Sequence, residues 1–475
     1  MDGGLCDELL EEVLRRLPRR GPFFASFTAD VSLVSKRWLR LYRSTRSTLS
    51  LRLSPDDCTP SDSLSSFLSH FPCLSSLSIT IDGGDSVSSF PDPILLSVAS
   101  FCPKLTHLCL QPGPVSHFPL LSLSTSCPHL TSLDIALRRP FCSHWLRFFH
   151  SLKNLNVSFL SVPKGFEPVD AACEGNFDGE LKLETLHVSP IQRGDYGLNW
   201  LWKSCKNLKK LQLKCCGGIG DDTSVSSFVN CLKDLQEVEL IHCTRPIRDE
   251  ILLTLVDNCV SLSSLLVHDR YAGTIGLRQF IAHSRCNLQK LDLHILHGCL
   301  RENDLLAVAE KFTGLLSLRL RGFLFNTGSQ GLKTMMLAMS NELEELALVN
   351  CNWERGLLTT LGQKFQNLRK LDLSSNKGMM AEEEFISMLA SCNFLTKLKL
   401  RRCEGLTNAS LVSMFKSCKQ LESVDIMDCP GIEAESVELF VLNCPRLRRI
   451  RVEESKISNV SRSWASKKLV ELVFH

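Results

Sequence analysis

One phrase, Leu-x-x-Leu-x-Leu, recurs along most of the chain. Residues 392–406, CNFLTKLKLRRCEGL, carry it in full, with Leu395, Leu398 and Leu400 as its three leucines. From Leu183 to Leu447, successive copies begin 25 to 28 residues apart. The opening leucines are Leu74, Leu105, Leu130, Leu152, Leu183, Leu208, Leu235, Leu262, Leu288, Leu315, Leu343, Leu368, Leu395, Leu421, Leu447 and Leu469. So regular a period means that stacked units, rather than separate globular domains, determine the fold.

The period and the spacing of the leucines are the signature of leucine-rich repeats. Side chains alternate along a strand, so the leucines of each Leu-x-Leu piece point into the body and the residues between them face outward. A later part of each unit has helical spacing, and no unit buries its own apolar face, so neighbouring units must stack. We therefore predict an α/β fold: a helical N-terminal module, then a curved solenoid, or horseshoe, over residues 74–475. The solenoid has about 16 repeats and a parallel β-sheet on its concave face.

Fourteen of the 22 cysteines follow the same period. One group lies two to four residues before an opening leucine: Cys102, Cys127, Cys205, Cys231, Cys259, Cys286, Cys392, Cys418 and Cys444. A second group lies eight residues after one, at Cys216, Cys243, Cys351, Cys403 and Cys429, and Asn376 takes that position in its own repeat. Zinc ligands are spaced in close pairs instead. We interpret these cysteines as buried packing residues in a reducing compartment, and we expect no metal.

A different module precedes the repeats. Residues 5–18, LCDELLEEVLRRLP, have apolar residues at helical spacing, and Pro18 ends the pattern. A second amphipathic helix is predicted within residues 31–44, where Val34, Trp38 and Leu41 recur at helical spacing. Two helices of this size are too small to fold stably alone, so a partner or the repeats must cover them.

This module resembles an F-box. The matching residues are Leu5, Glu8, Leu9, Leu10, Val13, Leu14, Leu17 and Pro18, then Leu33, Val34, Lys36, Arg37 and Trp38. Cys6 stands where the family has a proline, and Ser35 stands where it has a cysteine. The resemblance implies an F-box over residues 1–50, a linker leading into the solenoid over residues 51–73, and a Skp-type adaptor as partner. The adaptor-binding residues that it implies are Leu5, Leu9, Leu10, Val13, Leu14, Leu17, Pro18, Leu33, Val34 and Trp38.

An F-box followed by leucine-rich repeats, with a junction similar to that of plant F-box proteins, implies the substrate-recognition subunit of an SCF-type ubiquitin ligase. In that family the adaptor links the F-box to a cullin, and the repeats hold the protein that is ubiquitinated. Two alternatives remain open. The N-terminal helices would be a cap on a ligase-independent interaction scaffold, or the chain would be a small-molecule co-receptor like plant hormone receptors of this architecture.

No catalytic pattern stands out in the sequence. A phosphate-binding glycine loop, G-x-S-x-G and H-E-x-x-H are all missing, so we expect a non-catalytic subunit without a cofactor. The N-terminus has no apolar signal region and the chain has no run of 18 apolar residues, so we expect no membrane span and a location in the nucleus or cytoplasm. The net charge of +3 is too small to indicate nucleic acid.

Basic residues at outward-facing positions of the later repeats form the candidate substrate-binding surface. They are Arg319, Arg321, Lys370, Lys397, Lys399, Arg401, Arg402, Arg449 and Arg451. Acidic residues, including Asp372, Asp425 and Asp428, lie on adjacent rungs. Two interpretations follow: a solvated face of interleaved charges, or a docking surface for an acidic or phosphorylated segment.

Histidines also align between repeats. His268 and His294 each lie six residues after an opening leucine, and His242 is close to the same position on the preceding strand. Neighbouring strands lie about 5 Å apart, so the first two rings are predicted to stack. We interpret these histidines as surface residues in preference to a metal pair.

Two insertions interrupt the period, at residues 82–94 and 159–182. We interpret both as surface loops, the safer reading for long insertions in a solenoid. The second carries Phe159, Phe166 and Phe177, which in an alternative reading fold over the concave side.

Overall fold

The computed structural model of the chain describes most of its length. The described residues are 6–16, 35–53, 60–81, 91–139, 144–160, 179–195, 197–269, 275–295, 300–323, 330–376 and 381–474. Residues singled out above that lie outside these ranges are Leu5, Leu17, Pro18, Leu33, Val34, Phe166 and Phe177, together with residues 82–90 and 161–178 of the two insertions. The chain divides into two compact units, residues 1–232 and 233–475, and each is described by itself.

Two helices open the first unit, α1 (Asp7–Arg16) and α3 (Lys36–Thr45). Acidic residues occupy the first turn of α1, where they favour the positive end of the helix dipole. The Ser35 side chain caps α3 by accepting a hydrogen bond from the Trp38 backbone N–H at 3.2 Å. Serine at this position therefore has a local structural role, whatever residue the F-box pattern prefers there.

Parallel strands follow in the first unit, each paired with the next. They are β1 (Thr48–Leu53), β2 (Ser76–Ile81), β3 (His107–Val115), β4 (Ser132–Arg138), β5 (Asn154–Leu160), β6 (Thr185–Ser189) and β7 (Lys210–Lys214). The connecting helices are α4 (Pro60–Ser69), α5 (Pro91–Phe101), α6 (His117–Ser126), the 3-10 helix η1 (His144–Phe148), α7 (Leu198–Ser204) and α8 (Ser224–Cys231). The register aligns the leucines of successive repeats, for example Leu77 with Leu108 and Leu186 with Leu211. The leucines thus form a continuous buried column.

The repeats begin earlier than the sequence boundaries placed them. Strand β1 pairs with β2 over its whole length, from Thr48 opposite Ser76 to Leu53 opposite Ile81. Helix α4 carries buried Leu64 and Leu68 at helical spacing and packs beside α5. Residues 51–73 therefore contain the end of the first strand and the first helix of the array, where we expected a linker. The pattern was missed because Arg46 occupies the position of the opening leucine.

The second unit repeats the same arrangement. Its strands are β8 (Glu237–Ile241), β9 (Ser264–Asp269), β10 (Lys290–Ile295), β11 (Ser317–Arg321), β12 (Glu345–Val349), β13 (Lys370–Asp372), β14 (Lys397–Lys399), β15 (Ser423–Asp425), β16 (Arg449–Arg451) and β17 (Glu471–Val473). The helices are α9 (Arg245–Asn258), α10 (Ile275–His283), α11 (Glu302–Lys311), α12 (Gly331–Ala338), α13 (Leu357–Lys364), α14 (Glu382–Ser391), α15 (Asn408–Ser417), α16 (Ala434–Asn443), the 3-10 helix η2 (Glu454–Lys456) and α17 (Asn459–Lys467). All the strand pairs described within this unit are parallel.

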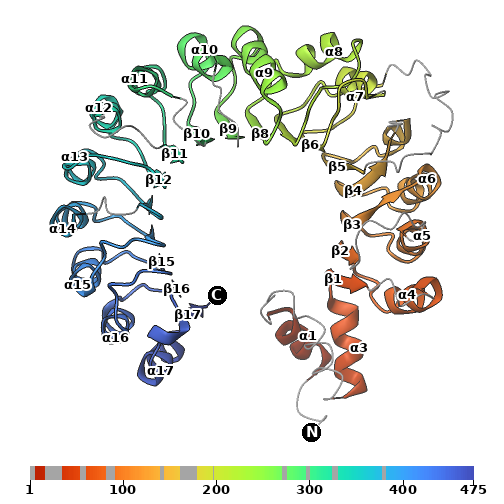
Figure 1. Cartoon of the computed structure of the whole chain (residues 1–475). Coiled ribbons are helices and arrows are strands. Elements are labelled where there is room, and N and C mark those ends of the chain that lie inside the picture. The colour runs from red at the N-terminus through yellow and green to blue at the C-terminus, as the bar shows by residue number, and fades with distance from the viewer. Residues whose placement is uncertain are drawn as a thin grey trace. The chain divides into compact units, whose positions relative to one another are not determined.

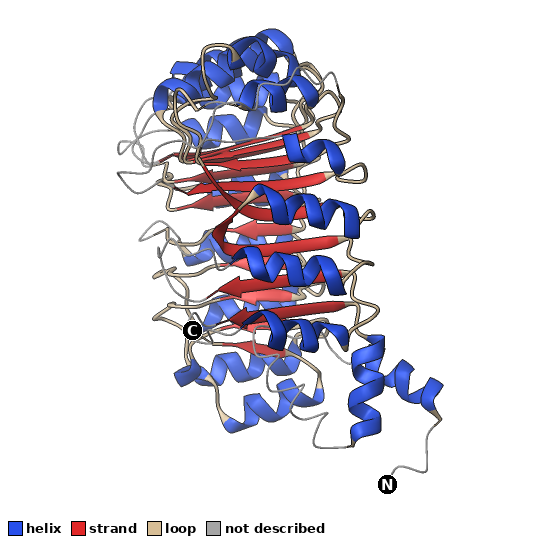
Figure 2. Cartoon of the chain, turned by 90° about the vertical axis from the view of Figure 1, so that its right-hand side faces the viewer, coloured by secondary structure: helices blue, strands red, loops and turns tan. Residues whose placement is uncertain are grey.

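In each unit the helices cover one face of the sheet and leave the other face open (Figures 1 and 2). The core lies between the two layers, where Leu395, Leu398 and Leu400 are fully buried. The predicted α/β architecture of stacked strand–helix repeats around a parallel sheet is confirmed. None of the helices in the described ranges combines the length and the apolarity needed to cross a bilayer.

A residue with a left-handed backbone conformation follows many of the strands. It lies seven residues after the opening leucine, as at Ser375 (φ 62°), Arg402 (φ 56°) and Asp428 (φ 60°). This reversal turns the next side chain, at the eighth position, into the body. Cys403 Sγ there donates to the Leu373 carbonyl at 3.2 Å, and Cys429 Sγ donates to the Leu400 carbonyl at 2.9 Å. Each thiol thus satisfies a backbone acceptor that the preceding strand leaves at its end.

Candidate functional site

The open face of the second unit carries all nine basic residues predicted for substrate binding. They come from β11, β13, β14 and β16 and from the turn that follows β14. Most of them are paired with a carboxylate on a neighbouring rung. The pairs are Arg319 with Glu345, Lys370 with Glu345 (3.4 Å), Lys399 with Asp372 (3.9 Å), Arg401 with Asp428 (3.2 Å), Arg402 with Asp428 (3.3 Å), Arg449 with Glu471 (2.8 Å) and Arg451 with Asp425 (3.6 Å).

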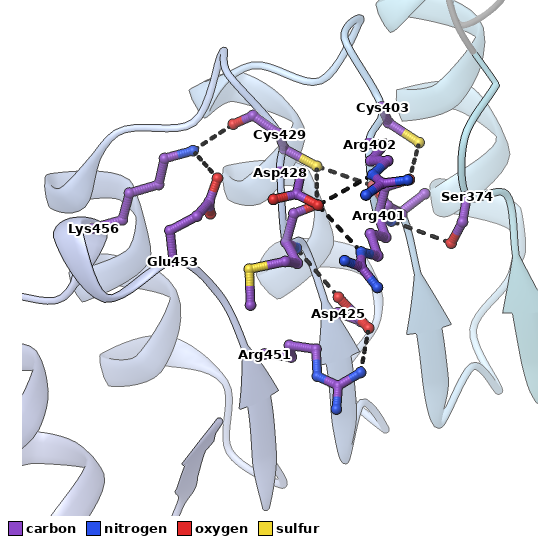
Figure 3. Close-up of polar contacts among 12 residues, drawn as sticks. Ser374, Arg401, Arg402, Cys403, Asp425, Asp428, Cys429, Arg451, Glu453 and Lys456 are labelled. Atoms are coloured by element: carbon purple, nitrogen blue, oxygen red, sulfur yellow. Dashed lines mark hydrogen bonds and ion pairs between the residues drawn. The ribbon is translucent and has the colours of Figure 1, made fainter. Parts of the chain in front are cut away.

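Each of these ion pairs joins residues of two successive repeats, and none joins two residues of the same strand. Figure 3 shows Arg401 and Arg402 converging on Asp428, and Arg451 reaching back to Asp425. Burial acts to raise the pKa of the Asp428 carboxyl, but hydrogen bonds from both arginines hold the pKa below its ordinary value. Ion pairs exposed to this degree contribute about 0–1 kcal/mol each. For these residues the structure favours the interpretation as interleaved, self-neutralising charges.

Arg321 and Lys397 differ from the other seven. Neither makes an ion pair with a carboxylate in the described part of the chain. Lys397 is exposed on β14, where water can solvate its ammonium group. Arg321 is half-buried on β11, and its Nε is buried without a hydrogen-bond partner. Arg321 is therefore the half-buried basic residue of this face whose charge is not matched by an ion pair in the described ranges.

Two histidines lie beside Arg321 on the open face. The register places His268 opposite His294, and His294 opposite Arg321. The His268 and His294 rings meet edge to face with centroids 5.4 Å apart, close to the spacing expected from the sequence. His268 Nε2 lies 3.2 Å from Asp292 Oδ1, and Asp292 is nearly fully buried. No set of three or more His, Cys, Asp or Glu side chains in the described ranges is arranged to hold a metal ion.

The environment of Asp292 shows how charge is distributed here. Burial acts to raise the pKa of its carboxyl, but His268, Arg321 and Arg319 outweigh burial and lower that pKa. Burial lowers the pKa of the His294 imidazole, and the neighbouring His268 and Arg321 lower it further. Asp292 is therefore ionised and His294 is mainly neutral near pH 7. The burial of Asp292 was not predicted, because Asp292 lies between two inward-pointing leucines, a position that is usually exposed.

The open face of the first unit is different in character. A hollow of about 350 Å³ lies on strands β3 to β7. Its lining is mainly uncharged, and consists of Gln111, Ala136, Asn156, Ser158, Leu160, His187, Val188, Ser189, Gln212 and Lys214. We did not predict this hollow, although the scarcity of charge at the outward positions of these repeats was visible in the sequence. Phe159 does not reach over this face, because it is buried within β5.

The repeat cysteines are buried thiols. All fourteen cysteines that follow the period are buried, and they pack between neighbouring repeats. Burial raises the pKa of Cys403 and Cys418 to about 12, and that of Cys392 to about 11. Because the thiolate is the reactive form, these side chains are unreactive near neutral pH. The interpretation of these cysteines as packing residues is confirmed.

Alkylation of the native protein should therefore be selective. At pH 7.5, iodoacetamide is expected to modify Cys6, Cys73 and Cys215, the exposed cysteines among those described, and to leave Cys392, Cys403 and Cys418 unmodified. Peptide mass spectrometry before and after denaturation measures the difference. Rapid native labelling of the buried group would contradict the packing described above.

The α1–α3 module has an apolar cluster of its own. Leu10 and Leu14 of α1 pack against Leu41 and Tyr42 of α3, with Trp38 partly buried beside them. Arg37 Nε donates to Asp7 Oδ1 at 2.7 Å, which ties the start of α3 to the start of α1. The residues predicted to bind an adaptor therefore separate into two groups. Leu10 and Leu14 are core residues of the module and are not available to a partner.

Leu9 and Val13 form the second group. They lie four residues apart on α1, so they share a helix face, and their exposed fractions are 55% and 46%. The apolar surface of α1 is therefore wider than the part that packs against α3, and its Leu9 and Val13 edge is turned outward. Leu9 and Val13 are thus exposed apolar side chains beside the packed cluster of the module.

Comparison with known proteins identifies the repeat. A family model described as leucine-rich repeat matches residues 204–222. NLR family CARD domain-containing protein 4 from Xenopus tropicalis is 25% identical over 227 residues, which are 45% of this chain and 22% of that protein. Its counterpart from Rattus norvegicus is 27% identical over 246 residues, or 48% and 23% of the two chains. The chain thus spans less than a quarter of the length of these relatives.

Two solved structures align with this chain at low sequence identity. A chain of the yeast Rad7–Elc1 complex is 14% identical, with 99% of this chain and 93% of that chain covered at a TM-score of 0.45. An internalin from Listeria monocytogenes is 15% identical, with 75% and 88% covered at a TM-score of 0.40. The repeat period, the parallel sheet with helices on one face and the family match together give the chain the leucine-rich-repeat fold.

Proposed function

We propose that this chain is the substrate-recognition subunit of an SCF-type ubiquitin ligase. The α1–α3 module binds a Skp-type adaptor and, through it, a cullin, and the repeats hold the protein to be ubiquitinated. The chain itself is non-catalytic and acts in the nucleus or cytoplasm. It would bring the target close to a partner-bound conjugating enzyme, which raises the effective concentration of the target's lysines.

The exposed apolar edge of α1, formed by Leu9 and Val13, is the observation that carries this proposal. Leu9 and Val13 remain exposed although Leu10 and Leu14, about 100° further round the helix, are buried against α3. A helical cap on the first repeat would turn one apolar face inward and a polar face outward. An adaptor interface needs an apolar centre on the outside, with larger side chains such as Trp38 nearby. The F-box resemblance of the same residues supports the same partner.

The repeats support the substrate-holding role by their chemistry. Seven of the nine basic residues on this face are already paired with carboxylates, and the exceptions within the described ranges are the exposed Lys397 and the half-buried Arg321. A surface of this kind favours partners whose charges match its pattern, and it repels mismatched ones. We propose the open face of the second unit as the docking surface for the target.

Affinity purification of the full chain from cells, followed by mass spectrometry, tests the proposal. We expect an adaptor and a cullin to copurify in near-stoichiometric amounts, and ubiquitinated proteins to accumulate on the bait under proteasome inhibition. Copurification of repeat-binding proteins without an adaptor or cullin would refute the ligase role and favour the ligase-independent scaffold. A small molecule that copurifies and is required for target capture would favour the co-receptor.

A further inference from the structure

Five residues at the same strand position form a column across the open face of the second unit. Each lies six residues after the opening leucine position, and the strand registers place them side by side from β8 to β12. In order they are Ile241, His268, His294, Arg321 and Val349. The two ends of this column are apolar, and its three central residues carry nitrogen groups that can bind an anion. The column is therefore a site with an apolar residue at each end, unlike the series of paired charges on β13 to β16.

Arg321 is the permanent charge of this site. The other arginine of β11, Arg319, is occupied by Glu345 and lies 4.0 Å from Asp292. Arg321 has no such carboxylate in the described ranges, and its Nε is buried without a hydrogen-bond partner. The neighbours of Arg321 in the column, His294 on one side and Val349 on the other, supply no negative charge. A guanidinium group in this setting is prepared to bind a planar, bidentate acceptor.

The two histidines and Asp292 determine how much negative charge a ligand at this site can carry. His268 is held by Asp292 at 3.2 Å, so its ring is already committed on one side. His294 makes its ring contact with His268 and borders Arg321. The ionised Asp292 opposes any ligand with a large negative charge. One guanidinium, a neighbouring neutral imidazole and a nearby carboxylate together match a single negative charge better than a double one.

We propose that Arg321 and His294 bind the side-chain carboxylate of a glutamate or aspartate in the docked target. The guanidinium group of Arg321 forms the bidentate contact, and His294 adds a hydrogen bond from its ring N–H. The inference rests on the proposed function in one respect, because it takes the open face of the second unit as the docking surface. It narrows the nine candidate basic residues to one and adds a histidine that the basic pattern did not include.

The site should strengthen as the pH falls. The groups that face His294 are His268 on β9, Asp292 on its own strand, Arg321 on β11 and His242 after β8. Of these, only Asp292 favours the protonated ring, so the free His294 is neutral near pH 7. A bound carboxylate favours the imidazolium form. Protonation and binding therefore assist one another, and the affinity rises as the pH falls through the pKa of His294.

Titration of the full chain with a synthetic peptide tests the site. The probe is a peptide of alternating glutamate and alanine, acetylated and amidated so that its only carboxylates are side chains, with a neutral dye for anisotropy. We expect Arg321→Gln to weaken binding at least about tenfold. The matched control Lys397→Gln removes the same charge from the same face and should change the affinity less than about twofold. Wild type should bind more tightly at about pH 5.5 than at about pH 7.5, and His294→Gln should reduce that difference.

A second peptide, with phosphoserine in place of each glutamate, distinguishes the two kinds of anion. Arg321→Gln should cost the glutamate peptide more affinity than the phosphoserine peptide, and the opposite order would overturn the carboxylate assignment. Equal losses from Arg321→Gln and Lys397→Gln would also overturn it, because they would mean diffuse attraction. Unchanged thermal melting shows that each variant is folded. Adaptor binding, measured on the same samples, reports on the proposed function separately, since Arg321 lies in the other unit from α1.

Discussion

Replacing Leu9 and Val13 together by aspartate should weaken binding of a Skp-type adaptor more than about 100-fold. Both side chains are about half exposed on the outer face of α1, so the double variant places two charges where an apolar interface centre is proposed. Losing two such anchors costs about 2 kcal/mol or more each, and every 1.4 kcal/mol is a factor of about ten in affinity. Calorimetric titration of the full chain with the purified adaptor measures the loss.

An equally charged change elsewhere provides the control. Phe118 and Leu121 of α6 are also exposed apolar residues within one turn of a helix, and their replacement by aspartate adds the same two charges. That variant should bind the adaptor like the wild type. Leu10 is a poor choice for this test, because it is 1% exposed and an arginine there would disrupt the packing of α1 on α3. Equal binding by the Leu9/Val13 variant and the wild type would remove α1 from the interface.

Replacing Asn376 by alanine should lower the free energy of unfolding by about 2–4 kcal/mol. The Asn376 side chain is 2% exposed and makes three hydrogen bonds to backbone groups. Its Oδ1 accepts from the Cys351 N–H at 2.7 Å, and its Nδ2 donates to the carbonyls of Leu348 at 2.7 Å and Leu373 at 2.6 Å. Alanine would remove the side-chain partner of the Cys351 N–H and of the Leu348 carbonyl, while the Leu373 carbonyl would keep its hydrogen bond from Cys403 Sγ. Urea denaturation followed by circular dichroism measures the change.

The repeats themselves supply the matched variant for this prediction. Other repeats carry cysteine at the same position. In the next repeat that residue is Cys403, whose Sγ donates to the Leu373 carbonyl. Asn376→Cys restores one donor in a familiar geometry, so its cost should be less than half that of Asn376→Ala. Equal costs for the two variants would mean that volume, and not hydrogen bonding, determines the role of the eighth position.

The leucine period predicted the repeat architecture because burial leaves few alternatives. Leu395, Leu398 and Leu400 are spaced so that one strand and its neighbours can bury all three, and each is fully buried. The cysteines were interpreted correctly for the same reason, since their spacing follows the repeat. The start of the array was placed too late because β1 lacks the opening leucine, and pairing with β2 compensates for its absence.

The charge pattern was harder to interpret from the sequence. Lys399 and Asp372 are 27 residues apart in the chain, and only the register of β13 with β14 shows that they are partners. The alternation along each strand identifies which charged residues face outward. Which of them form ion pairs depends on which strands are neighbours and on their register. Arg321 stands out only after the partners of the other arginines are known.

The two apolar pairs of α1 illustrate a similar limit. Helical spacing groups Leu9 with Val13 and Leu10 with Leu14, but it cannot say which pair turns toward α3. The packing of Leu10 and Leu14 against Leu41 and Tyr42 decides this. The sequence resemblance had joined both pairs in one adaptor-binding set, and among the members of that set that the structure describes, Leu9 and Val13 are exposed.

Hydrogen–deuterium exchange of the full chain, with and without the purified adaptor, tests the central claim most directly. Two short helices that depend on one small cluster should exchange quickly in the free protein. If α1 and α3 bind the adaptor, protection should increase in residues 6–16 and 35–46 and remain unchanged across the repeats of the second unit. No protection in α1 and α3 at saturating adaptor, or protection confined to the repeats, would contradict the proposed role of this module.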